Sequence, residues 1–211
     1  MTMGAWDFVI GILIGVLLAC VSLVVQTSQK SPIRATYSGV VARSTVRRHP
    51  TQQRFLREAG RQIHVVKLAG YMFFGTITSV EKSVRELLEE RNFHQQPVRF
   101  IIIDLLHVSG IDFSAAEAFT RMRRLMQVKN VEMIISGVTP GSEIGKGLRA
   151  VGVWADDGTG DNVMVFLTLN AALECCENEF LKALYNQGQQ RASPHLGEFA
   201  CPLLVLFRRI N

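Results

Sequence analysis

The chain has 211 residues, of which 48% are hydrophobic and 19% are charged, and its formal net charge is +5. The length suits one ordinary domain with appendages, while the apolar fraction is high for a purely soluble protein. The basic residues gather between Ser28 and Arg61, where eight Lys and Arg accompany one acid, Glu58, so the rest of the chain is slightly acidic. A nucleic-acid-binding domain would carry its basic surface on the folded domain itself, and nucleic acid is therefore not expected as a partner.

An uncharged apolar stretch, FVIGILIGVLLACVSLVV, runs from Phe8 to Val25. As a helix it would be roughly 27 Å long, close to the roughly 30 Å hydrocarbon core of a bilayer. A signal peptide would carry positive charge before the apolar run, whereas here Asp7 precedes it and the basic segment follows it. A buried core helix is the other alternative, but the stretch is long and apolar all round. We therefore expect a transmembrane helix over residues 6–27, with everything after about Lys30 in the cytosol.

Residues 28–61 are predicted to form a basic cytosolic linker, after which the pattern becomes regular. Ile63–Leu68 and Tyr71–Gly75 are rich in β-forming residues and predict two strands, separated by a turn or a bulge at Ala69-Gly70. The capping-box sequence that follows, Thr78-Ser79-Val80-Glu81, predicts the start of an amphipathic helix.

The run Val98–Asp104 is apolar without alternation, which is typical of a strand buried on both faces of a covered sheet. A second capping-box sequence, from Ser114 to Glu117, predicts the start of the next helix. Val131–Gly137 predicts a further strand. The inner stripe of the helix between these two strands is predicted to comprise Ala115, Phe119, Met122 and Met126.

The alternation continues to the end of the domain. Thr139-Pro140 has the form of an N-cap and a first helical residue, Asn162–Leu167 predicts a last strand, and Asn170 is the expected cap of the last helix. The order is ββαβαβαβα, which predicts an α/β fold with a mostly parallel or mixed sheet flanked by helices. We place this single domain at residues 62–185 and leave residues 186–211 as an unassigned tail.

Familiar catalytic and metal-binding motifs are incomplete in this sequence. Gly141–Gly147 resembles a phosphate-binding loop but lacks one spacer residue and the Ser or Thr that would hold magnesium. Asp156–Asp161 places carboxylates on a glycine turn but lacks the terminal Glu of a calcium-binding EF-hand. His64, His107 and His195 are scattered, with no Cys or His at metal spacing. We therefore expect no catalytic residue, no metal and no cofactor, and an enzyme is not expected.

The stretch from Asp104 to Ser114 is the most informative candidate site. Asp104 closes the buried strand and Ser114 opens the following helix, and ligands of such folds bind where a central strand feeds a helix N-terminus. Asp112 would place a carboxylate there. The alternative is that Asp112 and Ser114 only cap the helix, and the two interpretations are compatible.

The sequence FIIIDLLHVSGIDFSAAEAF is similar to the signature loop of STAS domains, the module shared by sulfate transporters and anti-sigma factor antagonists. The predicted element order also resembles a STAS domain, and a membrane helix, a basic linker and a STAS domain end the SulP-type (sulfate permease family) transporters. ARSTVRRHPTQQRFL and KLAGYMFFGT look most like fungal vacuolar-type members. The resemblance implies an interaction loop comprising Asp104, Ser109, Gly110, Asp112, Phe113 and Ser114.

The chain departs from this family in two respects. In the bacterial antagonists the residue after the loop Asp is the serine that is phosphorylated, and here that position is Phe113. Phosphorylation, if it occurs, would fall on Ser114 or Ser109. SulP transporters also need many membrane helices, and one candidate span cannot form a transport pathway. The chain would then be the C-terminal piece of a longer protein, a truncated gene model or a single-span relic.

The resemblance implies two alternative functions. The first is the C-terminal portion of a SulP-like anion or solute transporter, whose STAS domain regulates and binds proteins. The second is a single-span, membrane-tethered STAS signalling module switched by phosphorylation or by nucleotide binding. Both imply an integral membrane protein with a cytosolic STAS domain, and the vacuolar membrane is one implied location. The implied partners are the transporter membrane core, in the same or another chain, another cytosolic protein, or a second copy in a dimer.

Overall fold

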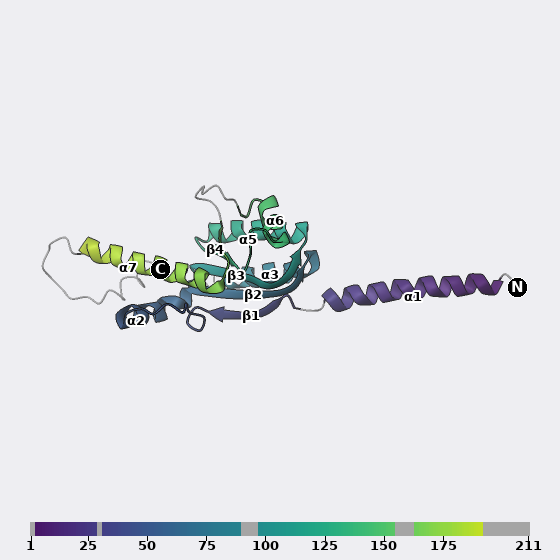
Figure 1. The fold of residues 1–211 in the computed structure, drawn as a ribbon, viewed down its shortest axis with the longest axis horizontal. Helices are drawn as coiled ribbons and strands as arrows, with labels where there is room; N and C mark the ends of the chain where they lie inside the picture. The colour runs from purple at the N-terminus through teal and green to yellow at the C-terminus, as the bar shows by residue number, and fades with distance from the viewer. Residues whose placement is uncertain (1–2, 29–30, 90–96, 155–162, 192–211) are drawn as a thin grey trace. The chain divides into compact units, whose positions relative to one another are not determined.

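A computed structural model describes residues 3–28, 31–89, 97–154 and 163–191 (Figure 1). The chain divides into two compact units, Met1–Ser31 and Pro32–Asn211, which are described separately below.

The first unit contains one long helix, α1 (Met3–Ser28), where the sequence predicts a transmembrane segment. Its Phe8–Gln26 segment has 19 residues and a mean hydropathy of 3.1, and all of its side chains are exposed. Among the described residues, this is the one helix long and apolar enough to cross a bilayer.

The second unit is built on a five-stranded sheet with strand order β1-β2-β3-β4-β5. β1 is antiparallel to β2, and β2 to β5 are parallel to one another, so the sheet is mixed as predicted. The parallel pairs need helical crossovers, which the chain supplies between consecutive strands. The strands are β1 (Ile33–Ser38), β2 (Ile63–Met72), β3 (Phe100–Ile111), β4 (Glu132–Ser136) and β5 (Met164–Phe166).

Helices cover both faces of this sheet and enclose two apolar cores. α3, α5 and α6 pack on one face, and α2 and α7 pack on the other (Figure 1). The predicted stripe of α5 is buried in the first core, as its spacing requires. The helices are α2 (Pro50–Ala59), α3 (Phe74–Leu87), α5 (Phe113–Val128), α6 (Glu143–Ala150) and α7 (Leu169–Arg191), with a 3-10 turn at Gly60–Gln62.

The predicted hairpin after residue 62 is wrong. Residues 63 to 72 form one continuous strand, β2, and the register of its pairing with β3 shifts after Lys67 and after Gly70. Gly70 has a φ of +88°, so of the turn and the bulge that the sequence left open at Ala69-Gly70, the bulge is confirmed. The antiparallel partner of β2 is instead β1, which lies within the segment that the sequence predicts as a linker. The expected linker therefore holds β1 and α2, two elements of the folded domain.

Helix starts also differ from the predicted caps. α3 begins at Phe74, and the Thr76 hydroxyl oxygen accepts a hydrogen bond from the Phe73 N–H at 3.0 Å, so the Thr78 sequence lies inside the helix. α6 is capped by Ser142 and not by Thr139. At α7 the Thr168 hydroxyl accepts from the Ala171 N–H, so Asn170 is not the cap.

Candidate functional site: the carboxyl edge of the sheet and a polar clamp

The predicted signature loop is not a loop, because β3 continues as a strand to Ile111. Met72 and Ile111 are register partners at the ends of β2 and β3, and the Asp112 N–H donates to the Met72 carbonyl at 3.0 Å. In both strands one residue then separates the strand from a helix, α3 or α5. We call the last residues of β2 and β3 and the first turns of α3 and α5 the carboxyl edge.

Asp104 is buried inside the sheet and not at this edge. Its Oδ1 accepts hydrogen bonds from the Ser136 hydroxyl at 3.2 Å and from the Leu106 N–H at 3.3 Å. The carboxylate therefore joins β3 to β4, and its surroundings fit a structural role. Next to it Gly137 has a φ of +79°, and a Cβ there would lie 2.5 Å from the Leu106 nitrogen. Both the positive φ and the short distance to the Leu106 backbone require glycine at position 137.

The other predicted loop residues have separate roles at the carboxyl edge. Asp112 is the N-cap of α5, and its Oδ1 accepts from the Ala115 N–H at 2.6 Å, so its predicted capping role is confirmed. Ser114 lies in the first helical turn and is exposed, so it is not the cap. Ser109 is also exposed, whereas Gly110 is buried. A Cβ on Gly110 would lie 2.7 Å from the ring of Tyr71, its register partner on β2.

The exposed surface of this edge is aromatic. Phe74 is 65% exposed, Phe113 is 64% exposed and Tyr71 is 52% exposed. Within the described residues, no group of three or more His, Cys, Asp or Glu is placed to hold a metal ion. The chemistry that this edge offers is apolar contact, flanked by the hydroxyls of Ser109 and Ser114.

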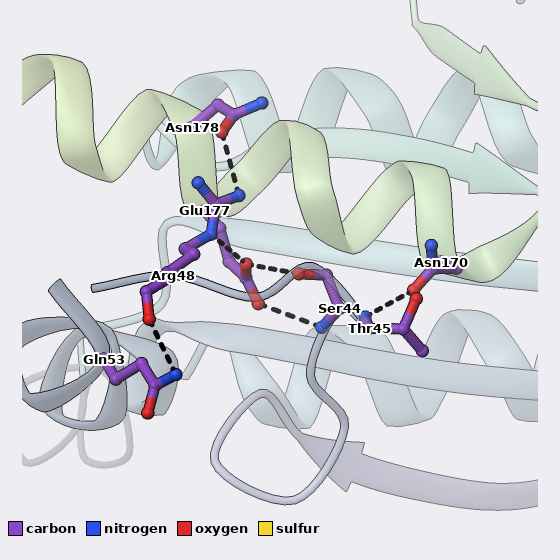
Figure 2. Close-up of polar contacts among 7 residues, drawn as sticks. All are labelled: Ser44, Thr45, Arg48, Gln53, Asn170, Glu177 and Asn178. Carbon is purple, nitrogen blue, oxygen red and sulfur yellow. Dashed lines mark hydrogen bonds and ion pairs between the residues drawn. The ribbon is translucent and has the colours of Figure 1, made fainter. Parts of the chain in front are cut away.

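A second feature, which the sequence did not predict, is a cluster of polar contacts on the face of the sheet that α2 and α7 cover (Figure 2). Glu177 on α7 is buried and accepts from the Ser44 N–H at 3.0 Å and from the Ser44 hydroxyl at 2.5 Å. The Arg48 Nε donates to Oε2 at 3.0 Å, the carboxylate oxygen that also accepts from the Ser44 hydroxyl, while the Ser44 N–H donates to Oε1. We call Ser44, Arg48 and Glu177 the polar clamp.

Further contacts extend the clamp in both directions (Figure 2). The Thr45 N–H donates to Asn170 Oδ1 at 2.8 Å, and the Arg48 guanidinium also donates to Asn178 Oδ1 at 2.9 Å. The Gln53 amide donates to the Arg48 carbonyl, which links the cluster to α2. These hydrogen bonds and the ion pair hold the segment between β1 and α2 against α7.

One signal in the sequence could have indicated the clamp. Glu177 directly follows Cys176 on the apolar stripe of α7, which a solvated Glu would avoid. A buried carboxylate needs partners of opposite charge or hydrogen-bond donors. The basic segment could supply them, but a separation of 129 residues between Arg48 and Glu177 hides the pairing from any local pattern.

Comparison with known proteins now identifies the class of domain. Residues 57–149 match the STAS domain family. The mixed five-stranded sheet with its flanking helices agrees with that match, and the chain therefore contains a STAS domain, as its resemblance predicts.

Individual relatives extend the comparison beyond this domain. The chain is 39% identical over 201 residues to the vacuolar basic amino acid transporter VSB1 of Saccharomyces cerevisiae, covering 93% of this chain and 19% of the transporter. It is 28% identical over 173 residues to glutaminase 2 of Bradyrhizobium diazoefficiens, covering 81% of this chain and 26% of that protein. The structure of the murine Solute Carrier 26 family member A9 anion transporter matches 80% of this chain and 25% of its own, with a TM-score of 0.54 and 15% identity, which shows a shared fold. The chain thus spans about a fifth of the yeast protein and about a quarter of the other two.

Proposed function

We propose that the chain is the C-terminal part of a SulP-like secondary transporter, comprising a membrane helix followed by a cytosolic STAS domain. The observation that carries this proposal is the extent of the similarity to the yeast transporter. An alignment over 93% of the chain cannot be limited to the STAS domain and must include part of α1. The similarity to glutaminase 2 is weaker and covers less of the chain.

The solute class follows from the same relative. Because the yeast protein is named as a vacuolar basic amino acid transporter, we propose that the complete protein moves lysine, arginine or histidine across the vacuolar membrane. The basic residues that follow α1 favour a cytosolic position for the STAS domain, since Lys and Arg near a membrane helix are retained on the cytosolic side.

The STAS domain is proposed to act as a regulatory contact module, with the carboxyl edge as its contact surface. Phe113 cannot accept a phosphoryl group, and its exposed ring suits contact with an apolar surface. Ser109 and Ser114 are exposed hydroxyls near it in the chain, and they are the observation that favours the second candidate, a tethered module switched by phosphorylation.

The test of the transporter proposal is solute uptake by isolated vacuoles. Vacuoles from cells with and without the intact gene are given radiolabelled arginine in the presence of ATP, with radiolabelled glutamate as the control solute. We expect loss of the gene to reduce arginine uptake and to leave glutamate uptake unchanged. Equal arginine uptake in the two preparations would refute the proposed solute class.

A further inference from the structure

Phe74 and Phe113 occupy equivalent positions at the carboxyl edge. Each is the first residue of its helix, and each lies two residues beyond one of the register partners Met72 and Ile111. Because those strands are parallel neighbours and α3 packs against α5, both rings lie at the same end of the sheet. Tyr71 lies one residue before Met72, with its ring over Gly110, and adds a third aromatic side chain to this edge.

The exposure of these two phenylalanines contrasts with the burial of other phenylalanines in the domain. Four other phenylalanines are buried in the two cores. Phe74 and Phe113 belong to neither of the two apolar cores, so packing within the domain does not account for their large apolar side chains. Exposed apolar side chains that gather at one place mark a contact surface. The buried phenylalanines are Phe55, Phe100, Phe119 and Phe180.

The path of the chain places this edge, and not the opposite one, next to the point where the domain is tethered. The Pro32 carbonyl accepts from the Ala69 N–H at 2.9 Å, near the end of β2. β1 then runs antiparallel to β2, so that its last residue, Ser38, pairs with His64 near the start of β2. Four residue steps separate Pro32 from Ser28, the last residue of α1, and a chain of that length reaches at most about 14 Å.

We propose that the aromatic carboxyl edge, formed by Tyr71, Phe74 and Phe113, docks on the lipid surface of the membrane that α1 spans. This inference rests on the proposed membrane anchoring of α1. Aromatic side chains are favoured at the level of the lipid headgroups, where an apolar ring is partly dehydrated. A short tether keeps the local concentration of the membrane surface high, so a weak affinity is enough to hold the edge in contact.

The test measures the depth of single tryptophans in vesicles that hold the full chain. Trp6 and Trp154, the two native tryptophans, are replaced by Phe. One tryptophan is then introduced by Phe74→Trp, Phe113→Trp or Val128→Trp. Val128 is the matched control, because it is 80% exposed and is the last residue of α5, whose first residue is Phe113. The vesicles contain phosphatidylcholine and phosphatidylserine, with or without bromine on the acyl chains, and bromine quenches a tryptophan that contacts the lipid.

Brominated lipid should lower the emission of the Phe74→Trp and Phe113→Trp chains by about twofold, and should leave the Val128→Trp chain nearly unchanged. Equal emission in both kinds of vesicle for all three variants would overturn the proposal and would indicate a protein as the partner of this edge. Equal quenching of all three would also overturn it, since the contact would not be specific to the carboxyl edge.

Extraction of the same vesicles with alkaline carbonate separates this inference from the proposed function. A chain that stays with the vesicles but shows no quenching at positions 74 and 113 contradicts the docking alone. A chain that is washed off contradicts the membrane anchoring on which both proposals rest.

Discussion

Removal of the Glu177 carboxylate tests whether the polar clamp holds the domain together. In a Glu177→Ala variant the Ser44 N–H and hydroxyl and the Arg48 guanidinium lose their shared acceptor. The side chains of Arg48 and Glu177 are only 12% and 10% exposed, so water replaces the lost contacts poorly. The segment between β1 and α2 should then separate from α7.

The size of the effect follows from this burial. Breaking a fully buried ion pair costs about 3–5 kcal/mol, and the residual exposure of this pair reduces the expected loss to about 2–4 kcal/mol. For a domain of this size a loss of about 3 kcal/mol lowers the melting temperature by roughly 6–12 °C. Glu177→Gln keeps an acceptor for the Ser44 N–H but removes the charge that faces Arg48, so it should cost about 1–2 kcal/mol.

Urea unfolding of the domain Pro32–Arg191, followed by circular dichroism, measures these losses. The matched control is Glu179→Ala on the same helix, which removes an exposed ion pair with Lys182 and should cost less than about 0.5 kcal/mol. An Arg48→Met change combined with Glu177→Gln completes a double-mutant cycle, for which we expect a coupling of about 1–3 kcal/mol. A cost for Glu177→Ala equal to that of Glu179→Ala, or a coupling near zero, would refute the argument.

Three further predictions concern the rest of the domain. Gly137→Ala should destabilise it by about 2–4 kcal/mol because of the positive φ and the close backbone, while Gly141→Ala, with open space around it, should change unfolding by less than about 1 kcal/mol in the same urea assay. Burial lowers the pKa of His64, so the folded state binds this proton less readily than the unfolded chain. Stability should therefore fall as pH drops below about 6.5, and His64→Gln should flatten that slope in thermal melts from about pH 7 to 5.5. A fragment Gln62–Tyr185 lacks β1 and α2 and should aggregate or stay unfolded, whereas Pro32–Arg191 should be monodisperse and folded by gel filtration and circular dichroism; equal behaviour of the two would show that β1 and α2 are dispensable.

Local patterns predicted the elements that are buried by their own periodicity. The uninterrupted apolar run at the start of β3 is buried on both faces, and the stripe of α5 that includes Phe119 and Met122 is buried against it. A short stretch of sequence is enough to predict these elements, because a helix or a covered strand repeats its apolar side chains at a fixed period.

Local sequence patterns did not predict the elements that are stabilised by contacts between residues far apart in the chain. β1 is a half-exposed edge strand in a basic segment, and only its pairing with β2 makes it a strand. Ala69-Gly70 suggested either a turn or a bulge, and the sequence pattern could not show that a bulge lets β2 continue to Met72. The extension of β3 through Gly110 depends on that same strand, since the ring of Tyr71 covers the glycine.

The carboxyl edge was predicted in part. The sequence placed Asp112 and Phe113 directly before a helix start at Ser114, and the resemblance to STAS domains implied an interaction loop there. Phe74 was assigned to a strand, so its equivalence to Phe113 was not predicted. That equivalence depends on the register of two parallel strands that lie about 40 residues apart in the chain, which no local pattern encodes.

The size of the native protein tests the proposal that this sequence is the membrane-anchored C-terminal part of a larger transporter. An antibody raised against Pro32–Arg191 is used to probe carbonate-washed membranes and the soluble fraction of cells that express the gene. We expect a single product in the washed membranes, several times longer than 211 residues, because the yeast relative is about five times longer than the aligned segment. A product of 211 residues in those membranes would contradict the transporter proposal and favour the single-span module, and a product found only in the soluble fraction would contradict both.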